Sequence, residues 1–438
     1  MDIWHVRGGR KLEGVCRVQG SKNASLPILA AMAVSPLRAE LTNVPRLRDV
    51  DAALRILRHL GCRTEQEGDR VYIDSAGMTR GDIPHELMEE MRSSVIFMGA
   101  LLARCGEARM SLPGGCRLGK RPIDLHLAAL RQLGAEIREE EGEIVCRGGK
   151  LRGARIELPF PSVGATENAM LAACAAEGET VLCGAAREPE IKALQRLLCA
   201  MGAHIRGAGS GRIVIGGMVP RPALCARIPF DRIAASTLAC AAAATGGSIE
   251  LLDVDAQQFS TVLYFLNRAG CDIITQNSRV CLSAPSRLRG VGDLRTAPFP
   301  GFPTDAQPVL MAALLKSRGR TRITETIFEN RFRQAPELRR LGADVRVSGR
   351  TAEIRGVERL QGAALTAGDL RGGAAMILGG LAAEGETLIR DEGHVRRGYE
   401  ALDERLRALG ADIQTEICYE EKSDGDDKSD APAGEQAQ

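Results

Sequence analysis

Aromatic residues are scarce in this sequence: they make up 3% of the 438 residues, while hydrophobic residues as a whole make up 44%. Any core must therefore be aliphatic and rich in alanine, with closely packed helices. The chain also lacks an excess of either charge, because the formal net charge is only +2. Proteins that bind nucleic acid usually show a basic excess or stripe, so we expect no nucleic-acid partner.

Signals for metal binding, secretion and membrane insertion are missing too. The 13 cysteines include no C-x-x-C pair and no zinc spacing, and the six histidines are dispersed. This pattern favours reduced thiols in a cytoplasmic protein over disulfides or a metal site. The start, MDIWHVRGGRKLEG, lacks the apolar segment of a secretory signal. The longest apolar runs, such as residues 26–34, are too short to cross a bilayer, so we expect no membrane insertion.

One unit recurs six times along the chain. Each copy has a helix of small apolar residues, a short strand, an amphipathic helix, a glycine and two closing strands. A glycine just past a helix is the expected C-terminal cap, because glycine tolerates the left-handed conformation. The six cap glycines are 68–73 residues apart: Gly61, Gly134, Gly202, Gly270, Gly342 and Gly410. Six units suggest two globules of three, although a continuous solenoid has the same period.

The apolar helices belong in an interior, and a polar residue opens each of them. If these helices run side by side, their N-termini converge into a site for an anion. An alternative is that the cations at these positions merely pair with acidic residues. The positions are Lys22-Asn23, Arg92-Ser93, Thr166-Glu167, Arg232, Asp305 and Arg371.

The densest motif is LPGGCRLGKRPIDLH, residues 112–126. Its glycines let the backbone approach a ligand, and the cations around Cys116 favour a reactive thiolate. The other interpretation is that Cys116 is a small core residue like the remaining cysteines. The motif also spells G-x-x-x-x-G-K, but Arg121 stands where a P-loop needs Ser or Thr for magnesium. A nucleotide triphosphatase is therefore disfavoured.

Arginines follow several strands in the second half, including Arg331 and Arg397. The arginine fork suits carboxylates and phosphates. Other cations, such as Lys22 and Arg92, lie in the first half of the chain, so an anionic ligand bound by both groups would hold two globules together. Asp305 stands among these cations at the start of a helix. Two interpretations stay open for it: a helix cap, or an acceptor for the proton of a hydroxyl group.

Residues 1–417 resemble the UDP-N-acetylglucosamine 1-carboxyvinyltransferase family of enolpyruvyl transferases. The resemblance implies a two-domain inside-out α/β barrel with six βαβαββ-type repeats, three per domain. One domain would span residues 22–229 and carry Cys116; the other would span residues 1–21 and 230–418. Residues 419–438 form an acidic tail whose composition predicts disorder. The matching strings are GSKNASLPIL, VPRLRDVD, MRSSV, LPGGCRLGKRPIDLH, SVGAT, AAREPEI, RTAPFPGFPTD, ENRF, DLRGGAA and RRGYE.

The resemblance implies phosphoenolpyruvate and UDP-N-acetylglucosamine as substrates, with no cofactor and no metal. Cys116 would be the proton donor and the residue alkylated by fosfomycin, and Asp305 would accept the proton of the sugar 3′-hydroxyl. Lys22 and Arg397 would also be catalytic. The implied phosphoenolpyruvate site comprises Lys22, Asn23, Arg121, Arg331, Arg371 and Arg397. The implied UDP-sugar site comprises Asn23, Arg92, Arg121, Pro122, Ile123, Asp124, Leu125, Ser162, Val163, Gly164, Asp305 and Ile327.

Three positions depart from the family pattern and are expected to add positive charge near the site: Lys120, Arg333 and Arg396. Two rival functions are a shikimate 3-phosphate transferase and a non-catalytic protein that senses UDP-sugars. The PGGC and RPIDLH strings argue against the first. The joint presence of Lys22, Cys116, Asp305, Arg331 and Arg397 argues against the second. The oligomeric state cannot be predicted from the sequence.

Overall fold

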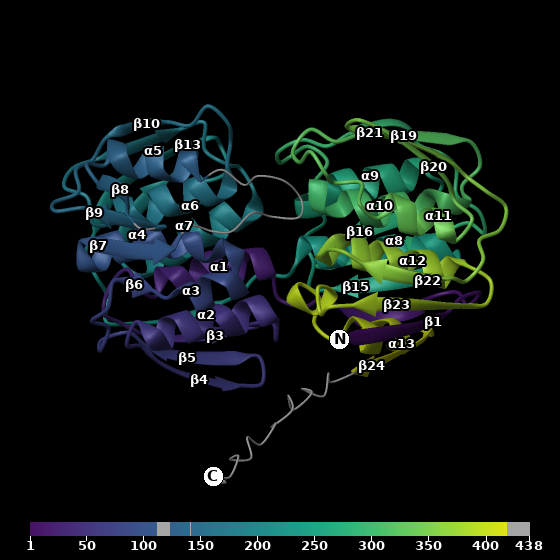
Figure 1. The fold of residues 1–438 in the computed structure, drawn as a ribbon, viewed down its shortest axis with the longest axis horizontal. Helices are drawn as coiled ribbons and strands as arrows, with labels where there is room; N and C mark the ends of the chain where they lie inside the picture. The colour runs from purple at the N-terminus through teal and green to yellow at the C-terminus, as the bar shows by residue number, and fades with distance from the viewer. Residues whose placement is uncertain (112–122, 141, 418–438) are drawn as a thin grey trace, which may run out of the picture.

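The computed structural model describes residues 1–111, 123–140 and 142–417. Two hydrophobic cores form in this part of the chain. We call the residues around the first core, which lie between 24 and 228, the first lobe. The second core takes residues 4–18 and 230–413, and we call its surroundings the second lobe. Figure 1 shows the two lobes side by side. The division at residues 22–229 stays our proposal for the domain boundaries.

The strands of the first lobe form three four-stranded sheets of the same design. In each sheet the first two strands pair in parallel, and the later pairings are antiparallel. The sheets are β14-β3-β5-β4 (Ala223–Arg227, Arg38–Thr42, Arg70–Asp74, Arg63–Glu67), β6-β7-β9-β8 (Asp82–Ile83, Glu107–Ser111, Glu143–Arg147, Glu136–Glu140) and β10-β11-β13-β12 (Arg155–Glu157, Thr180–Cys183, Arg212–Met218, Ala203–Arg206).

The second lobe repeats the design, and its sheets include the N-terminal strands β1 and β2. The sheets are β2-β15-β17-β16 (Glu13–Arg17, Ser248–Leu252, Arg279–Ser283, Asp272–Gln276), β18-β19-β21-β20 (Gly292–Arg295, Arg320–Thr324, Thr351–Arg355, Asp344–Ser348) and β22-β23-β1-β24 (Ala364–Ala367, Glu386–Asp391, Asp2–Arg7, Asp412–Ile417). Six repeats, three per lobe, are thereby confirmed, and a continuous solenoid is excluded.

Each repeat buries its apolar helix almost entirely and leaves one face of its amphipathic helix exposed. The inner helices are α1 (Lys22–Ala31), η1 with α4 (Arg92–Ile96, Phe97–Cys105), α6 (Val163–Ala173), α8 (Arg232–Thr245), η3 with α10 (Thr304–Ala306, Gln307–Ala313) and α12 (Leu370–Ala382). The second helices are α2 (Arg48–His59), α5 (Asp124–Gln132), α7 (Pro189–Ala200), α9 (Ser260–Arg268), α11 (Ala335–Arg340) and α13 (Leu402–Ala408). Short connecting helices are α3 (His85–Glu90), η2 (Ala256–Phe259), η4 (Leu314–Lys316) and η5 (Val395–Arg397).

Small residues allow the inner helices to touch. A side chain at Gly99 on α4 would lie 2.3 Å from the carbonyl oxygen of Asn168 on α6, so only glycine fits there. The Gly99 amide instead donates to Asn168 Oδ1 at 2.7 Å. All six predicted cap glycines have positive φ, as expected.

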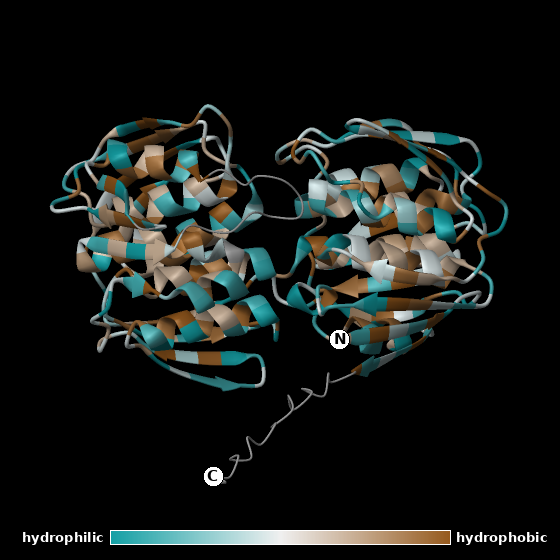
Figure 2. Ribbon diagram, viewed as in Figure 1, coloured by the Kyte–Doolittle hydropathy of each residue, from teal (hydrophilic) through white to brown (hydrophobic). Residues whose placement is uncertain are grey.

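The strands cover the helices with one face and meet solvent with the other. On β19, Thr321 and Ile323 are buried, while Arg320 and Arg322 face outward. Figure 2 shows the same change between hydrophobic and hydrophilic positions along the outer strands. Among the described residues, no helix is long and apolar enough to cross a membrane.

Candidate active site

Inner helices from the two lobes begin near each other. Ser21 caps α1 in the first lobe by accepting from the Ala24 amide at 3.2 Å. Asp231 caps α8 in the second lobe by accepting from two amides of that helix at 2.8 and 2.9 Å. Its other oxygen accepts from the Lys22 amide, the first residue of α1, at 3.2 Å. One aspartate therefore ties together the N-termini of helices from opposite lobes.

Asp305 lies between two buried arginines of the second lobe. Its Oδ1 accepts from Arg331 Nη2 at 2.7 Å, and its Oδ2 accepts from Arg371 Nη2 at 3.4 Å. Each arginine side chain is only 3% exposed, whereas the Asp305 side chain is 30% exposed. The interpretation of Asp305 as a simple helix cap is wrong, because its carboxylate binds guanidinium groups and no side chain caps η3 or α10.

The charges around Asp305 hold it firmly ionised. Burial alone would raise the pKa of its carboxyl, but Arg371, Arg331, Lys22 and Arg232 together lower that pKa well below its usual range. Lys22 belongs to the first lobe, so cations of both lobes act on this carboxylate. An anion with so low a pKa is a weak proton acceptor as it stands.

Arg371 has more hydrogen-bond donors than the described residues satisfy. Its Nε and Nη1 are buried without an acceptor, and its guanidinium lies 5.2 Å from the ring centre of Tyr399. Burial would lower the pKa of Arg371, but Tyr399 and Asp305 outweigh burial and raise it, so the group stays charged. A buried donor without an acceptor costs about 1–3 kcal/mol. A carboxylate ligand would offset that cost.

Lys22 and Arg397, from opposite lobes, meet at Asp49. Lys22 Nζ lies 2.7 Å from Asp49 Oδ2, and Arg397 Nε donates to Asp49 Oδ1 at 2.8 Å. Burial would raise the pKa of Asp49, but the two cations outweigh burial and lower it. The predicted phosphate-binding cations that the structure describes are thus brought together.

A second cross-lobe ion pair joins Arg232 to Glu190. Arg232 Nε donates to Glu190 Oε1 at 2.9 Å, and both side chains are below 10% exposed. Glu188 links the lobes as well, because its Oε1 accepts from the Phe299 amide at 3.2 Å. Glu167, on α6, is buried near these two glutamates: burial, Glu190 and Glu188 raise its pKa well above the usual value.

Several predicted UDP-sugar residues also lie together. Asp124 and Leu125 begin α5, and the same helix carries His126. A side chain at Gly164 would lie 2.7 Å from the His126 ring, so the starts of α5 and α6 pack directly together. Ser162 caps α6 by accepting from the Ala165 amide at 3.4 Å.

The other sugar-site predictions fall on different elements. Asn23 is the second residue of α1, Ile123 precedes α5, and Val163 is the first residue of α6. Ile327 is in the second lobe, where its amide donates to Glu325 Oε1 at 2.7 Å. Glu325 Oε2 in turn accepts from the hydroxyl of Thr304, the neighbour of Asp305, at 3.0 Å. The Ile327 loop is thus attached to the helix start that carries Asp305.

Some predictions cannot be placed. Cys116, Lys120, Arg121, Pro122 and residues 419–438 lie outside the described residues, and Arg92 is described only by its backbone in η1.

One expectation needs correction: Arg396 does not leave a free charge near the site. Its Nε donates to the buried Asp2 at 2.8 Å. Of the cations that open the inner helices, Lys22, Arg232 and Arg371 do pair with acidic side chains, as the alternative interpretation expected. Those acids belong to the same interface.

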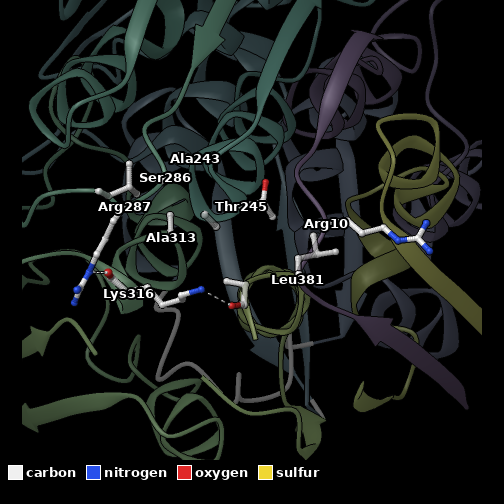
Figure 3. Close-up of a pocket in the computed structure, with 12 residues that line it drawn as sticks. Arg10, Ala243, Thr245, Ser286, Arg287, Ala313, Lys316 and Leu381 are labelled. Atoms are coloured by element: carbon white, nitrogen blue, oxygen red, sulfur yellow. Dashed lines mark hydrogen bonds between the residues drawn. The ribbon is translucent and has the colours of Figure 1, made fainter. Parts of the chain in front are cut away.

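A separate cavity of about 110 Å³ lies at the opposite, C-terminal ends of the inner helices of the second lobe. Figure 3 shows Lys316 pointing across it to the Ala382 carbonyl, a 3.1 Å hydrogen bond, while Arg287 donates to the Lys316 carbonyl at 2.9 Å. These cations cap helix carbonyls. None of the predicted site residues lines this cavity.

The two three-repeat lobes bring arginines, a lysine and several carboxylates together at their interface, an arrangement that suits small anionic substrates. The family model for EPSP synthase (3-phosphoshikimate 1-carboxyvinyltransferase) matches residues 6–406. The chain belongs to this enolpyruvyl transferase family.

Curated relatives named UDP-N-acetylglucosamine 1-carboxyvinyltransferase place the chain in that group within the family. The UDP-N-acetylglucosamine 1-carboxyvinyltransferase 2 of Caldanaerobacter subterraneus subsp. tengcongensis is 45% identical over 413 residues, 94% of this chain and 99% of that protein. The Granulibacter bethesdensis enzyme is 46% identical over 417 residues, with the same coverage.

Solved structures share the fold. The enolpyruvyl transferase NikO from Streptomyces tendae has a TM-score of 0.85 at 25% identity, over 94% of this chain and 98% of that one. EPSP synthase from Acinetobacter baumannii has a TM-score of 0.76 at 22% identity, over 95% of this chain and all of that one. The predicted inside-out α/β fold is confirmed.

Proposed function

We propose that this protein transfers the enolpyruvyl group of phosphoenolpyruvate to the 3′-hydroxyl of UDP-N-acetylglucosamine and releases phosphate, the first committed step of peptidoglycan synthesis. The observation that carries the proposal is the group of Asp305, Arg331 and Arg371, with Lys22 acting on it from the other lobe. It offers guanidinium groups for a carboxylate and one carboxylate for a hydroxyl proton.

The two arginines explain how Asp305 can become a base at the right moment. In the structure they bind Asp305 and keep its pKa low. The carboxylate of phosphoenolpyruvate suits the same two guanidinium groups, and the unsatisfied donors of Arg371 favour such a ligand. As that carboxylate neutralises the arginines, the pKa of Asp305 rises and its affinity for the hydroxyl proton grows. Binding of one substrate would thus activate the other.

The reaction then proceeds by addition and elimination. The 3′-oxygen attacks C2 of phosphoenolpyruvate while Asp305 takes the hydroxyl proton and C3 receives a proton from Cys116. In the elimination step, the thiolate left on Cys116 takes a proton from C3 of the tetrahedral phosphate ketal while the bond between C2 and the phosphate oxygen breaks, which leaves the enolpyruvyl ether and free phosphate. Lys22 and Arg397, with Arg121, stabilise the negative charge of the departing phosphate. The roles of Cys116 and Arg121 stay predictions.

The sugar nucleotide would lie along the starts of α5 and α6. The amides at the N-terminus of α6 suit a diphosphate, and this helix end is held against α5 by the contact of Gly164 with His126. Such a substrate requires no membrane, and a cytoplasmic location remains our expectation.

Phosphate release tests the proposal. The protein is mixed with phosphoenolpyruvate and either UDP-N-acetylglucosamine or shikimate 3-phosphate, and released phosphate is measured. Release only with the UDP-sugar supports the proposal. Release with shikimate 3-phosphate identifies the rival transferase, and binding of UDP-sugar without any release identifies the sensing protein.

A further inference from the structure

Asp49 is a buried acid in the middle of the predicted phosphate site. It lies in the first turn of α2 and is 1% exposed, far below the usual exposure of an aspartate. It contacts two cations at once, Lys22 of the first lobe and Arg397 of the second. Neither the sequence prediction nor the proposed mechanism gives it a role.

The geometry at Asp49 leaves part of each cation available. Arg397 uses the Nε and Nη2 edge of its guanidinium, at 2.8 and 3.4 Å, so the edge formed by Nη1 and Nη2 still has donors. Lys22 uses one of its three N–H donors. The Arg397 side chain is 31% exposed and that of Lys22 is 14% exposed, so their remaining donors are not sealed inside the protein.

Hydrogen bonds from the segments near residues 19 and 46 hold the turn that follows Arg397 in place. Gln19 Nε2 donates to the Gly398 carbonyl at 3.1 Å, and Gln19 Oε1 accepts from the Glu400 amide at 2.8 Å. Glu400 Oε1 accepts from the amide of Arg46, two residues before α2, at 3.1 Å. The backbone near Arg397 is thereby located, and Asp49 determines where the long side chain points.

We propose that Asp49 is a positioning residue that holds Lys22 and Arg397 at a fixed separation, so that their free donors bind the phosphate group of phosphoenolpyruvate. This inference rests on the proposed function. Removing the carboxylate would strengthen the attraction of the cations for an anion, but both side chains lie near water, where that gain is screened. The loss of orientation dominates, since a displacement of about 1 Å at an active site can cost about 100-fold in rate.

The test compares Asp49→Asn with Asp51→Asn. Asp51 is in the same turn of α2 but is exposed and has Arg55, Arg58 and Arg46 as its charged neighbours. We expect Asp49→Asn to lower kcat/KM for phosphoenolpyruvate about 10- to 100-fold, with KM for UDP-N-acetylglucosamine changed less than about twofold. Asp49→Glu should restore part of the loss, and Asp51→Asn should behave like the unchanged protein.

Direct binding of inorganic phosphate separates this inference from the proposed function. Titration calorimetry with phosphate, at matched ionic strength, should show weaker binding to Asp49→Asn than to the unchanged protein, even if no turnover is detected. If Asp49→Asn raised the KM values for both substrates equally and also lowered the melting temperature, Asp49 would have only a structural role. Tighter phosphate binding by Asp49→Asn would also overturn the inference, because Asp49 would then act as a competing anion.

Discussion

Replacing Asp305 with alanine should reduce both stability and turnover. The substitution leaves Arg331 and Arg371, each 3% exposed, without their shared carboxylate. Breaking a buried ion pair by removing one partner costs about 3–5 kcal/mol. The lower end applies here, because the Asp305 side chain is 30% exposed and Arg331 keeps its hydrogen bond to the Thr304 carbonyl at 3.2 Å. We therefore expect a loss of about 3 kcal/mol in the free energy of unfolding.

The same variant should lose the proton acceptor of the reaction. General base catalysis contributes about 100- to 10,000-fold, so kcat should fall by that factor while UDP-sugar binding persists. Denaturant unfolding and phosphate release measure the two effects. The lowered pKa of Asp305 also predicts how stability depends on pH. The stabilisation by the ionised carboxylate should be complete above about pH 3.9, the usual pKa of an aspartate in an unfolded chain, and should be lost as the pH falls from there through the lower folded-state pKa. Unchanged kcat, or unfolding as in the original protein, would refute the reasoning.

Three further predictions follow from buried contacts. Burial and two nearby glutamates raise the pKa of Glu167, so its protonated form should stabilise the fold fully below about pH 4.3 and lose that effect as the pH rises through the folded-state pKa. Glu167→Gln should flatten the alkaline side of the stability profile, and an unchanged slope would count against a retained proton. Gly164→Ala, whose new methyl would lie 2.7 Å from the His126 ring, should cost about 1–3 kcal/mol and raise KM for the UDP-sugar but not for phosphoenolpyruvate; equal changes in both would argue against a sugar site there. Arg396→Ala should cost about 1–3 kcal/mol by leaving Asp2 unpaired, with turnover within about twofold, and a large loss of turnover would restore Arg396 to the site.

Local signals made the fold predictable. Each cap glycine marks a helix end that needs positive φ, and each run of small residues marks an interior helix; both are properties of neighbouring residues. Convergence of the helix starts followed from the repeat itself, which is why Lys22, Asp305 and Arg371 could be selected in advance.

Partner identity was not predictable, because it depends on distant parts of the chain. Arg396 pairs with Asp2, 394 positions away, so its charge is neutralised in a way that no local pattern indicates. Asp49 appeared only as a letter in the VPRLRDVD string. Its importance comes from burial between cations of two lobes, 27 and 348 positions away. The local pattern, an acid in the first turn of a helix, is what the helix dipole favours in any case and does not point to these cations.

Equilibrium binding of phosphoenolpyruvate tests most directly whether both lobes hold one substrate, and it is measured with a UDP-N-acetylglucosamine analogue that lacks the 3′-hydroxyl, so that no turnover occurs. Lys22→Ala removes a cation of the first lobe, and Arg371→Ala removes one of the second. A hydrogen bond to a charged group contributes about 1.5–3 kcal/mol, so each variant should bind phosphoenolpyruvate about 10- to 150-fold more weakly, provided that it remains folded. Full affinity in either folded variant would contradict a site shared between the lobes.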